Sequence, residues 1–346
     1  MGKKHASIYD IAKEAGVSVT TVSRVINNPD KVNTHTRRKI YAIMERMNYA
    51  PNALAQSLVS RSTETIGVFI HDVKNPFYAE MLYEIEKKAF EKGYSIFIGN
   101  TSNQIKKEEA YVELFAKKHV DGIIMVGGRN VREAQSNHIL KTAERIPVIL
   151  TNHTVIGKNI YCICADEAEG AVMAVQHLID TGRRKIAYIN GHEEAYAKII
   201  KKDGYLKTLR RNNLAIDERL IVNAPRDTME GGYAACEELL GKGGSFDAVF
   251  VSNDLMAIGV LKKLASAGIR VPQDVSVVGY DDIQLCKFFS PSLSSVTQEC
   301  AEIGSMAVQM LIDVLEGKEV HKVTYLKPKL MIRESSSLDA GETWRT

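Results

Sequence analysis

The pattern of apolar and polar positions predicts three short helices, and no strand, in the first 50 residues. In the segment VTTVSRVIN, the apolar side chains Val22, Val25 and Ile26 share one helical face. Gly16 can end the preceding helix in a left-handed turn, and Ser18 can cap the next one. The predicted helices cover residues 8–15, 19–27 and 34–49. A helix, a tight turn and a second helix followed by a third form the helix-turn-helix arrangement.

From Thr65 onward, short apolar runs alternate with amphipathic segments of helical length. The runs TIGVFI, YSIFIGN, DGIIMVGG and IPVILTN are partly β-branched, as is typical of buried strands. Strands that alternate with helices predict a parallel sheet covered on both faces. The pattern restarts after about residue 163, so the expected fold class is α/β, with an all-α head followed by two tandem doubly wound lobes.

The same patterns predict where the domains begin and end. The helix-turn-helix head, the hinge linker, the two-lobed body and the polar, disordered tail are expected at residues 1–50, 51–63, 64–335 and 336–346. The first lobe is expected to take residues 64–163 and 290–322, and the second lobe residues 164–289 and 323–335. A chain of 346 residues suits this division, because single cores stop growing at about 250–300 residues.

Charge and cysteine content narrow the class of protein. Residues 1–62 hold ten Lys or Arg and four Asp or Glu, so a basic head precedes a mildly acidic body, which favours a polyanionic partner for the head. The basic start MGKKHAS is followed by no apolar run, so we expect no secretory signal, no membrane span and a cytoplasmic protein. Cys162 and Cys164 are expected to be a buried pair rather than a metal site, and no cofactor is expected.

Seven segments carry a more specific pattern: IYDIAKEAGVSVTTVSRVINNPDKV, NYAPNALAQSL, DVKNPFYAE, VDGIIM, SNDLMAIGV, VPQDVSVVGYDD and SPSLSSVTQ. This set resembles the lactose-repressor/galactose-repressor family of bacterial transcription regulators over about residues 6–335. The resemblance implies a periplasmic-binding-protein-like body behind the DNA-binding head. It also implies a homodimer that binds a near-palindromic operator in double-stranded DNA, and a small-molecule effector between the lobes that controls this binding.

The resemblance further implies which residues meet DNA. The leading residues of the second helix are expected to read base edges in the major groove: Val19, Thr20 and Arg24. Phosphate contacts are expected from five other residues of the head: Tyr9, Thr21, Ser23, Asn27 and Thr34. In the linker, Asn52 opens a hinge helix for the minor groove, where Leu58, with Ala55 beside it, wedges apart a base step. Without the motif, Arg24 is an ordinary solvated charge and Leu58 an ordinary linker residue.

For the effector, the pocket positions of the family correspond to nine residues: Asp72, Phe77, Tyr78, Asn152, Asp166, Lys201, Asp227, Asn253 and Asp281. Phe77 and Tyr78 offer rings for stacking. Lys201 stands where many members keep arginine, and Asp227 where some keep an aromatic residue. A pocket of this polarity favours a sugar or a sugar derivative, including one with a charged group that meets Lys201. Asp227 and Asp281 also suit an ordinary helix cap or turn.

Other functions remain open. The effector can be a nucleobase, or a phosphorylated carrier protein can bind the lysines at 198, 201 and 202. A periplasmic sugar-binding protein shares the body but lacks such a head. An enzyme of doubly wound fold needs a phosphate loop or a catalytic motif, and the chain contains no G-x-x-x-x-G-K-[ST], H-E-x-x-H, G-x-S-x-G or G-x-G-x-x-G. The head therefore favours the regulator over an enzyme.

Overall fold

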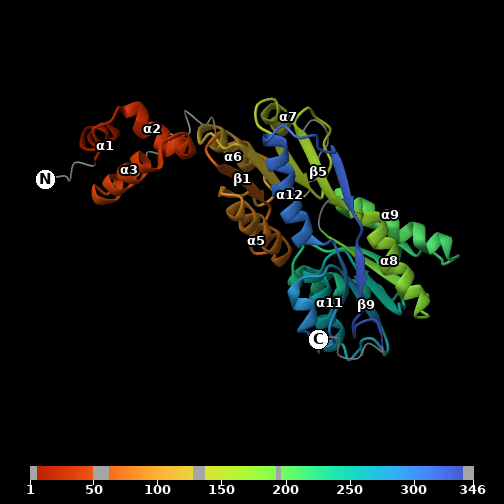
Figure 1. Cartoon of the computed structure of the whole chain (residues 1–346). Coiled ribbons are helices and arrows are strands. Elements are labelled where there is room, and N and C mark those ends of the chain that lie inside the picture. Colours follow the sequence, from red (N-terminus) through yellow and green to blue (C-terminus); the bar gives the residue numbers. More distant parts are fainter. Residues whose placement is uncertain (1–5, 50–61, 128–136, 192–195, 338–346) are drawn as a thin grey trace. The chain divides into compact units, whose positions relative to one another are not determined.

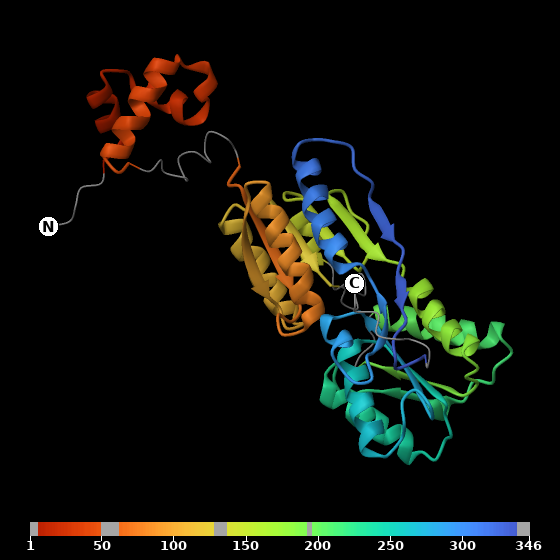
Figure 2. The same cartoon turned by 60° about the horizontal axis from the view of Figure 1, so that its bottom comes forward.

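The computed structural model describes residues 6–49, 62–127, 137–191 and 196–337. They fall into two compact units, one up to Glu64 and one from Thr65 onward (Figure 1). The smaller unit is helical, and the larger one contains two sheets with helices on both faces, which Figure 2 shows from a second direction. The α/β class with a helical head is thus confirmed.

The head consists of the helices α1 (Ile8–Ala15), α2 (Val19–Asn27) and α3 (Thr34–Arg46), with the 3-10 turn η1 (Pro29–Lys31) before α3. Ser7 and Asp10 close a capping box at the start of α1, and Gly16 ends this helix at a φ of 66°. The Ser18 side chain caps α2 by accepting from the backbone N–H of Thr21. The three helices enclose a small core: Ile11, Ala12, Ala15, Val22, Val25, Ile40, Ile43 and Met44.

The first lobe is built on a six-stranded parallel sheet in the order β11-β5-β4-β3-β1-β2. Its strands are β1 (Thr65–Ile70), β2 (Ser95–Asn100), β3 (Gly122–Val126), β4 (Val148–Thr151), β5 (Ile160–Ala165) and β11 (Val323–Leu326). Its helices are α5 (Pro76–Glu91), α6 (Ile105–Lys117), α7 (Asn137–Ala143) and α12 (Cys300–Leu315). Helices α5 and α12 pack together on one face, and α6 and α7 cover the other.

The second lobe repeats this architecture in the order β12-β10-β9-β8-β6-β7, with only β12 antiparallel. Its strands are β6 (Ile186–Asn190), β7 (Ile221–Asn223), β8 (Ala248–Val251), β9 (Ser276–Asp281), β10 (Ser294–Thr297) and β12 (Lys329–Met331). Its helices are α8 (Glu167–Asp180), α9 (Tyr196–Arg211), α10 (Met229–Gly241) and α11 (Asp254–Ser266), with the 3-10 turns η3 (Glu218–Leu220) and η4 (Gln284–Lys287). Helices α8 and α9 pack on one face of the sheet. Helices α10 and α11 pack together on the other, where Gly232 and Gly259 allow their backbones to approach.

The chain crosses between the lobes three times. The first crossing lies near the expected residue 163, and the other two differ from the expected boundaries. Strand β10, expected in the first lobe, pairs with β9 of the second. Strand β11, expected in the second lobe, pairs with β5 of the first. The chain therefore crosses after β5, after β10 and after β11. The apolar pattern of a strand predicts the strand itself, but its partner is set by long-range packing that no local pattern contains.

The end of the described chain is also more ordered than expected. Ser336, assigned to the polar tail, is 2% exposed, and its hydroxyl lies 2.8 Å from His177 Nε2 and 2.7 Å from Ser294 Oγ. Cys162 and Cys164 are buried free thiols, which confirms that the pair is buried. Within the described part of the chain, no helix is long and apolar enough to cross a membrane.

Candidate functional site

Helix α2 divides its side chains between the head core and solvent. Val22 and Val25 are fully buried, whereas Thr20 and Arg24 on the opposite face are exposed. Val19, at the first turn, is half-buried against the same core. The exposed face thus offers a hydroxyl and, one turn later, a guanidinium, and these groups can hydrogen-bond to base edges. The geometry allows the DNA-reading role expected for this helix.

The other candidates of the head differ in how freely they can reach a phosphate. Tyr9 is 71% exposed, and Thr34 at the start of α3 is exposed as well. The Thr21 hydroxyl lies 2.9 Å from that of the capping serine of α2. Asn27 is half-buried, and its Nδ2 donates to Ser23 Oγ over 3.3 Å. Three of these five polar groups must therefore share or exchange a local partner when they contact DNA.

The linker candidates lie outside the described residues. These are Asn52, Ala55 and Leu58. Isolated helices of this length are unstable in water, so a hinge helix needs a surface to pack against. Their role in the minor groove stays a prediction from the sequence.

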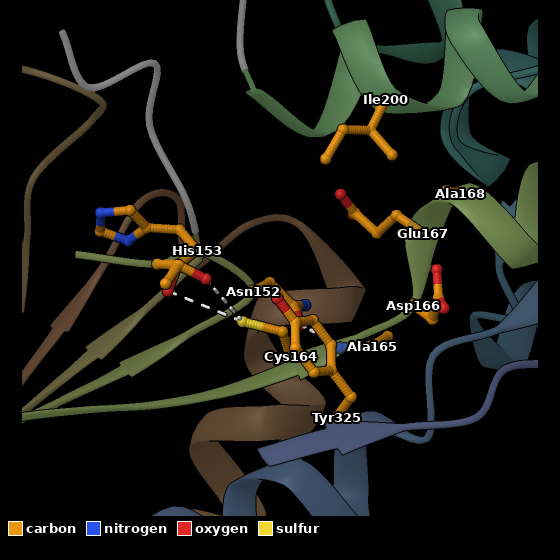
Figure 3. Close-up of a pocket in the computed structure, with 10 residues that line it drawn as sticks. Asn152, His153, Cys164, Ala165, Asp166, Glu167, Ala168, Ile200 and Tyr325 are labelled. Carbon is orange, nitrogen blue, oxygen red and sulfur yellow. Dashed lines mark hydrogen bonds between the residues drawn. The ribbon is translucent and has the colours of Figure 1, made fainter. Parts of the chain in front are cut away.

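A pocket of about 250 Å³ lies between the two lobes (Figure 3). Its lining comes from the segment after β4, the β5–α8 junction, α9 and β11: Asn152, His153, Thr154, Cys164, Ala165, Asp166, Glu167, Ala168, Ile200 and Tyr325. In Figure 3, Ile200 and Glu167 of the second lobe lie across from Asn152 and Cys164 of the first. Two of the nine expected effector residues, Asn152 and Asp166, therefore line this pocket.

Two groups of the first-lobe wall of the pocket, Asn152 and Cys164, are neutral and already oriented. Asn152 is buried, its Oδ1 accepts from Ala165 N over 3.2 Å, and its Nδ2 donates to Gln298 Oε1 over 3.0 Å. Burial raises the pKa of Cys164 to about 11, so its thiol stays protonated and points to the carbonyl oxygen of His153. A wall of this kind selects by hydrogen bonding rather than by charge.

Lys201 lies behind the second-lobe wall, in a different role from the one expected. Its side chain is 6% exposed, and Nζ donates to the carbonyl oxygen of Ser252 over 3.2 Å. The same nitrogen lies 3.6 Å from Glu167 Oε1 and 3.8 Å from the ring centroid of Tyr280. Burial raises the pKa of Glu167, and the positive charge of Lys201 opposes that rise. Lys201 thus faces a buried carboxylate and a backbone carbonyl, and it does not line the pocket itself.

Asp281, at the end of β9, is half-buried and belongs to a second group of acids. Its Oδ1 accepts from Gln298 Nε2 over 2.6 Å. Nearby Asp254 is fully buried and accepts from Ser295 Oγ over 2.6 Å and from Ile283 N over 2.9 Å. Burial raises the pKa of both carboxyls, and the charge of Asp281 raises that of Asp254 further. These acids therefore hold protons at a higher pH than exposed carboxyls do.

The two aromatic candidates, Phe77 and Tyr78, lie in different environments. Phe77 is 6% exposed and belongs to the core between α5 and the first sheet, so it cannot stack on an effector as expected. Tyr78 is half-buried, and its hydroxyl lies 3.5 Å from His71 Nδ1. Burial raises the pKa of Tyr78, and the negative charges of Asp281 and Asp227 raise it further. Tyr78 therefore faces the acids of the second lobe, although it belongs to the first.

The remaining candidates have structural roles of their own. Asp72, Asp166 and Asn253 each accept a hydrogen bond from a backbone N–H two or three residues later, which is the geometry of a cap or turn. Asp227 accepts from Lys198 Nζ over 2.7 Å. Within the described part of the chain, no group of three or more His, Cys, Asp or Glu side chains could hold a metal ion.

Sequence reasoning missed four residues that matter here. Glu167 directly follows Asp166, and its place in an acidic helix start concealed a buried side chain. Tyr325 lies on β11, whose lobe was misassigned. Asp254 and Gln298 occupy segments quoted as family motifs, but neither shows a local pattern that predicts burial. Of these four, Glu167 and Tyr325 line the pocket, and Gln298 lies in the crossing between β10 and α12.

Two regions of the chain match known protein families. Residues 7–52 match the model of bacterial regulatory proteins of the lacI family, and residues 175–336 match that of a periplasmic binding protein-like domain. The chain is 33% identical over 332 residues to the HTH-type transcriptional repressor PurR of Histophilus somni, covering 95% of this chain and 98% of the relative. The chain belongs to the lacI family.

Solved structures of transcriptional regulators match almost the whole chain. The lac repressor dimer bound to operator and the anti-inducer ONPF matches with a TM-score of 0.87 and 26% identity, over 96% of this chain and 99% of that one. The transcriptional regulator CelR in complex with cellobiose matches with a TM-score of 0.71 and 29% identity, over 95% and 99%. This chain is therefore a DNA-binding transcriptional regulator of the lacI family, and these relatives are regulators rather than enzymes.

Proposed function

We propose that this protein represses transcription by binding a near-palindromic operator as a homodimer, and that a small molecule between its lobes controls the binding. The observation that carries the DNA-binding part is the two-faced helix α2. Thr20 and Arg24 point outward, while Val22 and Val25 fasten the helix to its core. A guanidinium can make a bidentate contact to guanine, and a threonine hydroxyl can serve several bases.

A second copy of the chain is the partner that the surface of the body favours. Strand β2 is an edge strand and exposes Phe97 at 43% and Ile98 at 50%. In the second lobe, Phe288 is 70% and Phe289 is 37% exposed. Apolar side chains gathered at an edge strand and after η4 suit a symmetric interface, which buries the same patches of both copies. The related lac repressor structure is a dimer on operator.

A neutral, hydroxyl-rich ligand, such as a sugar, is the effector that we propose. Asn152 can donate to a hydroxyl, and the Asp166 and Glu167 carboxylates can accept from vicinal hydroxyls. The 64% exposed ring of Tyr325 can pack on a sugar face. Because Lys201 is engaged by Glu167, an anionic sugar finds acids rather than a free cation. The pocket of about 250 Å³ is small, which favours one or two sugar rings.

The two alternative effectors, a nucleobase and a phosphorylated carrier protein, differ in how well the described residues suit them. A nucleobase remains the second candidate, because Tyr325 also offers a ring for base stacking. A phosphorylated carrier protein loses the lysine surface suggested for it. Lys198 pairs with Asp227 and Lys201 is buried, so of the three lysines only Lys202 remains for an outside partner.

Two experiments test the proposal. Selection of random duplexes by the full chain should yield a near-palindromic site whose binding weakens with salt, and Arg24→Ala should relax preference at one base pair of each half-site. A thermal-shift screen with D-glucose, D-galactose, D-xylose, cellobiose, sugar phosphates, uronates and nucleobases should raise the melting temperature for a neutral sugar. If the selection enriched no duplex sequence, the DNA-binding part of the proposal would be contradicted. If only nucleobases raised the melting temperature, a nucleobase would replace the sugar as the proposed effector.

A further inference from the structure

Gln298 connects two of the predicted effector residues, which belong to different lobes. It lies in the crossing between β10 of the second lobe and α12 of the first, and its side chain is 3% exposed. Its Oε1 accepts from Asn152 Nδ2 over 3.0 Å, and its Nε2 donates to Asp281 Oδ1 over 2.6 Å. A single buried amide thus bridges Asn152 of the first lobe and Asp281 of the second.

We propose that Gln298 is a positioning residue for effector binding, which holds Asn152 and Asp281 at a fixed separation across the two lobes. This inference rests on the proposed function, because it assumes that the effector binds where these two groups meet. Gln298 itself need not touch the ligand. Its role is to keep a donor on one lobe and an acceptor on the other in register before the ligand arrives, which lowers the entropic cost of binding.

The hydrogen-bonding capacity of the three groups indicates that Gln298 bridges Asn152 and Asp281 without competing with an effector for them. Gln298 takes one of the two Nδ2 hydrogens of Asn152 and one of the two oxygens of Asp281. Asn152 Oδ1 is held separately by Ala165 N. The second Nδ2 hydrogen of Asn152 and the second carboxylate oxygen of Asp281 take no part in these bonds to Gln298. An effector can therefore add to the bridge without breaking it.

Charged groups from several elements face this bridge and must be considered in any test that uses pH. Lys201 of α9, Glu167 of α8 and Asp227 before α10 act on the carboxyl of Asp281, and the hydrogen bond from Gln298 lowers its pKa against the effect of burial. The charge of Asp281 in turn raises the pKa of Asp254 on α11 and of Tyr78 on α5, in addition to the effect of burial.

A first test needs no effector. In the full chain, Asn152→Ala and Asp281→Ala are made singly and together, and the unfolding equilibrium constant is measured by denaturant titration. We expect the two changes to be non-additive by about tenfold, and this coupling to vanish in a Gln298→Ala background. Additive effects in the original chain, or coupling that persists without Gln298, would overturn the bridge. This result does not depend on the proposed effector class.

A second test uses D-glucose, D-galactose, D-xylose and cellobiose as probes in isothermal titration of the full chain. For whichever of these sugars binds the original chain, Gln298→Ala should weaken the affinity by about tenfold or more. Gln309→Ala, on α12 with its amide on Asp313, is the matched control and should leave affinity unchanged. Unchanged or tighter binding by Gln298→Ala would refute the positioning role. If none of these sugars binds the original chain, the proposed effector class fails while the coupling test still decides the bridge.

Gln298→Glu separates positioning from a merely structural effect. A glutamate at this position can accept from Asn152, but it can donate to Asp281 only when a proton lies between the two acids. Its affinity relative to that of the original chain should therefore recover as the pH falls from about 8 to about 6, since paired carboxyls titrate above their usual range. A ratio that does not change with pH would contradict the proposed donor role of Nε2.

Discussion

The ammonium group of Lys201 lies 3.6 Å from the carboxylate of Glu167, and the two side chains are only 6% and 8% exposed. Two opposite charges thus lie buried behind one wall of the pocket, with Tyr280 beneath the ammonium. Such a pair contributes little net stability, because desolvation offsets the attraction, but removal of one partner leaves an uncompensated charge. The pair thus places two compensating charges, rather than a lone cation, behind this wall of the pocket.

Lys201→Met should destabilise the body strongly. The variant leaves Glu167 buried without its partner, so we expect a loss of about 3–5 kcal/mol in the free energy of unfolding. The double variant Lys201→Met/Glu167→Leu should recover most of that loss. Denaturant unfolding of the full chain and both variants measures the effect. A double variant less stable than the single one would show that packing, rather than charge, dominates here.

Stability of the body should fall as the pH rises through the neutral range. Burial raises the pKa of Asp254 from 3.8 to about 8, so the folded state binds more protons than the unfolded state between these values, and the free energy of unfolding decreases with pH there. Asp254→Asn, which mimics the neutral acid, should flatten this slope. Asp274→Asn is the control. The arginine beside Asp274 lowers its pKa to about 2, so its contribution is lost only in acid. Denaturation midpoints from pH about 5 to about 8 measure both variants, and an unchanged slope in Asp254→Asn would disprove the assignment.

Two substitutions in α2 should have opposite consequences. Val22 is fully buried in a very small core, so Val22→Ala should cost the head about 2 kcal/mol and lower its helicity. Arg24→Ala should leave the head folded, because that side chain is exposed, and change only base preference. Circular dichroism and duplex selection on the full chain separate the two effects. Unfolding by Arg24→Ala would assign this residue to the fold.

The exposed ring of Tyr325 gives a direct test of stacking in the pocket. Tyr325→Ala should weaken sugar binding by about tenfold, whereas Tyr325→Phe keeps the ring and should retain most of the affinity. Tyr83→Ala, at an exposed position outside the lining, is a suitable control. Isothermal titration measures all three. Equal losses in the Ala and Phe variants would assign the contribution to the hydroxyl instead of the ring.

Leu58→Ala should weaken operator binding far more than non-specific binding. An inserted leucine acts only where the duplex is kinked, and its removal takes away contacts that the kinked site permits. Fluorescence anisotropy with operator and with unrelated duplex gives the two affinities. Equal losses for both duplexes would exclude the wedge.

Much of the head could be predicted from the sequence, because its structure depends on neighbours in the chain. The Ser7–Asp10 capping box, the left-handed Gly16 and the buried stripe of Val22 and Val25 all lie within a few residues of one another. Local hydrogen bonding and helical periodicity are sufficient to define such features. The alternation of strands and helices in the body was predictable for the same reason.

Which residues line the pocket depends on the tertiary structure. Phe77 and Lys201 looked available from their motifs, yet the first packs into the core of its lobe and the second binds Glu167. Gln298 had no recognisable pattern, and only the crossing of the chain brings its amide between Asn152 and Asp281. The sequence by itself determined the helices, the strands and the two-lobed class. Which side chains face one another across the lobes depends on long-range pairing and desolvation, and these exist only once the sheets have assembled.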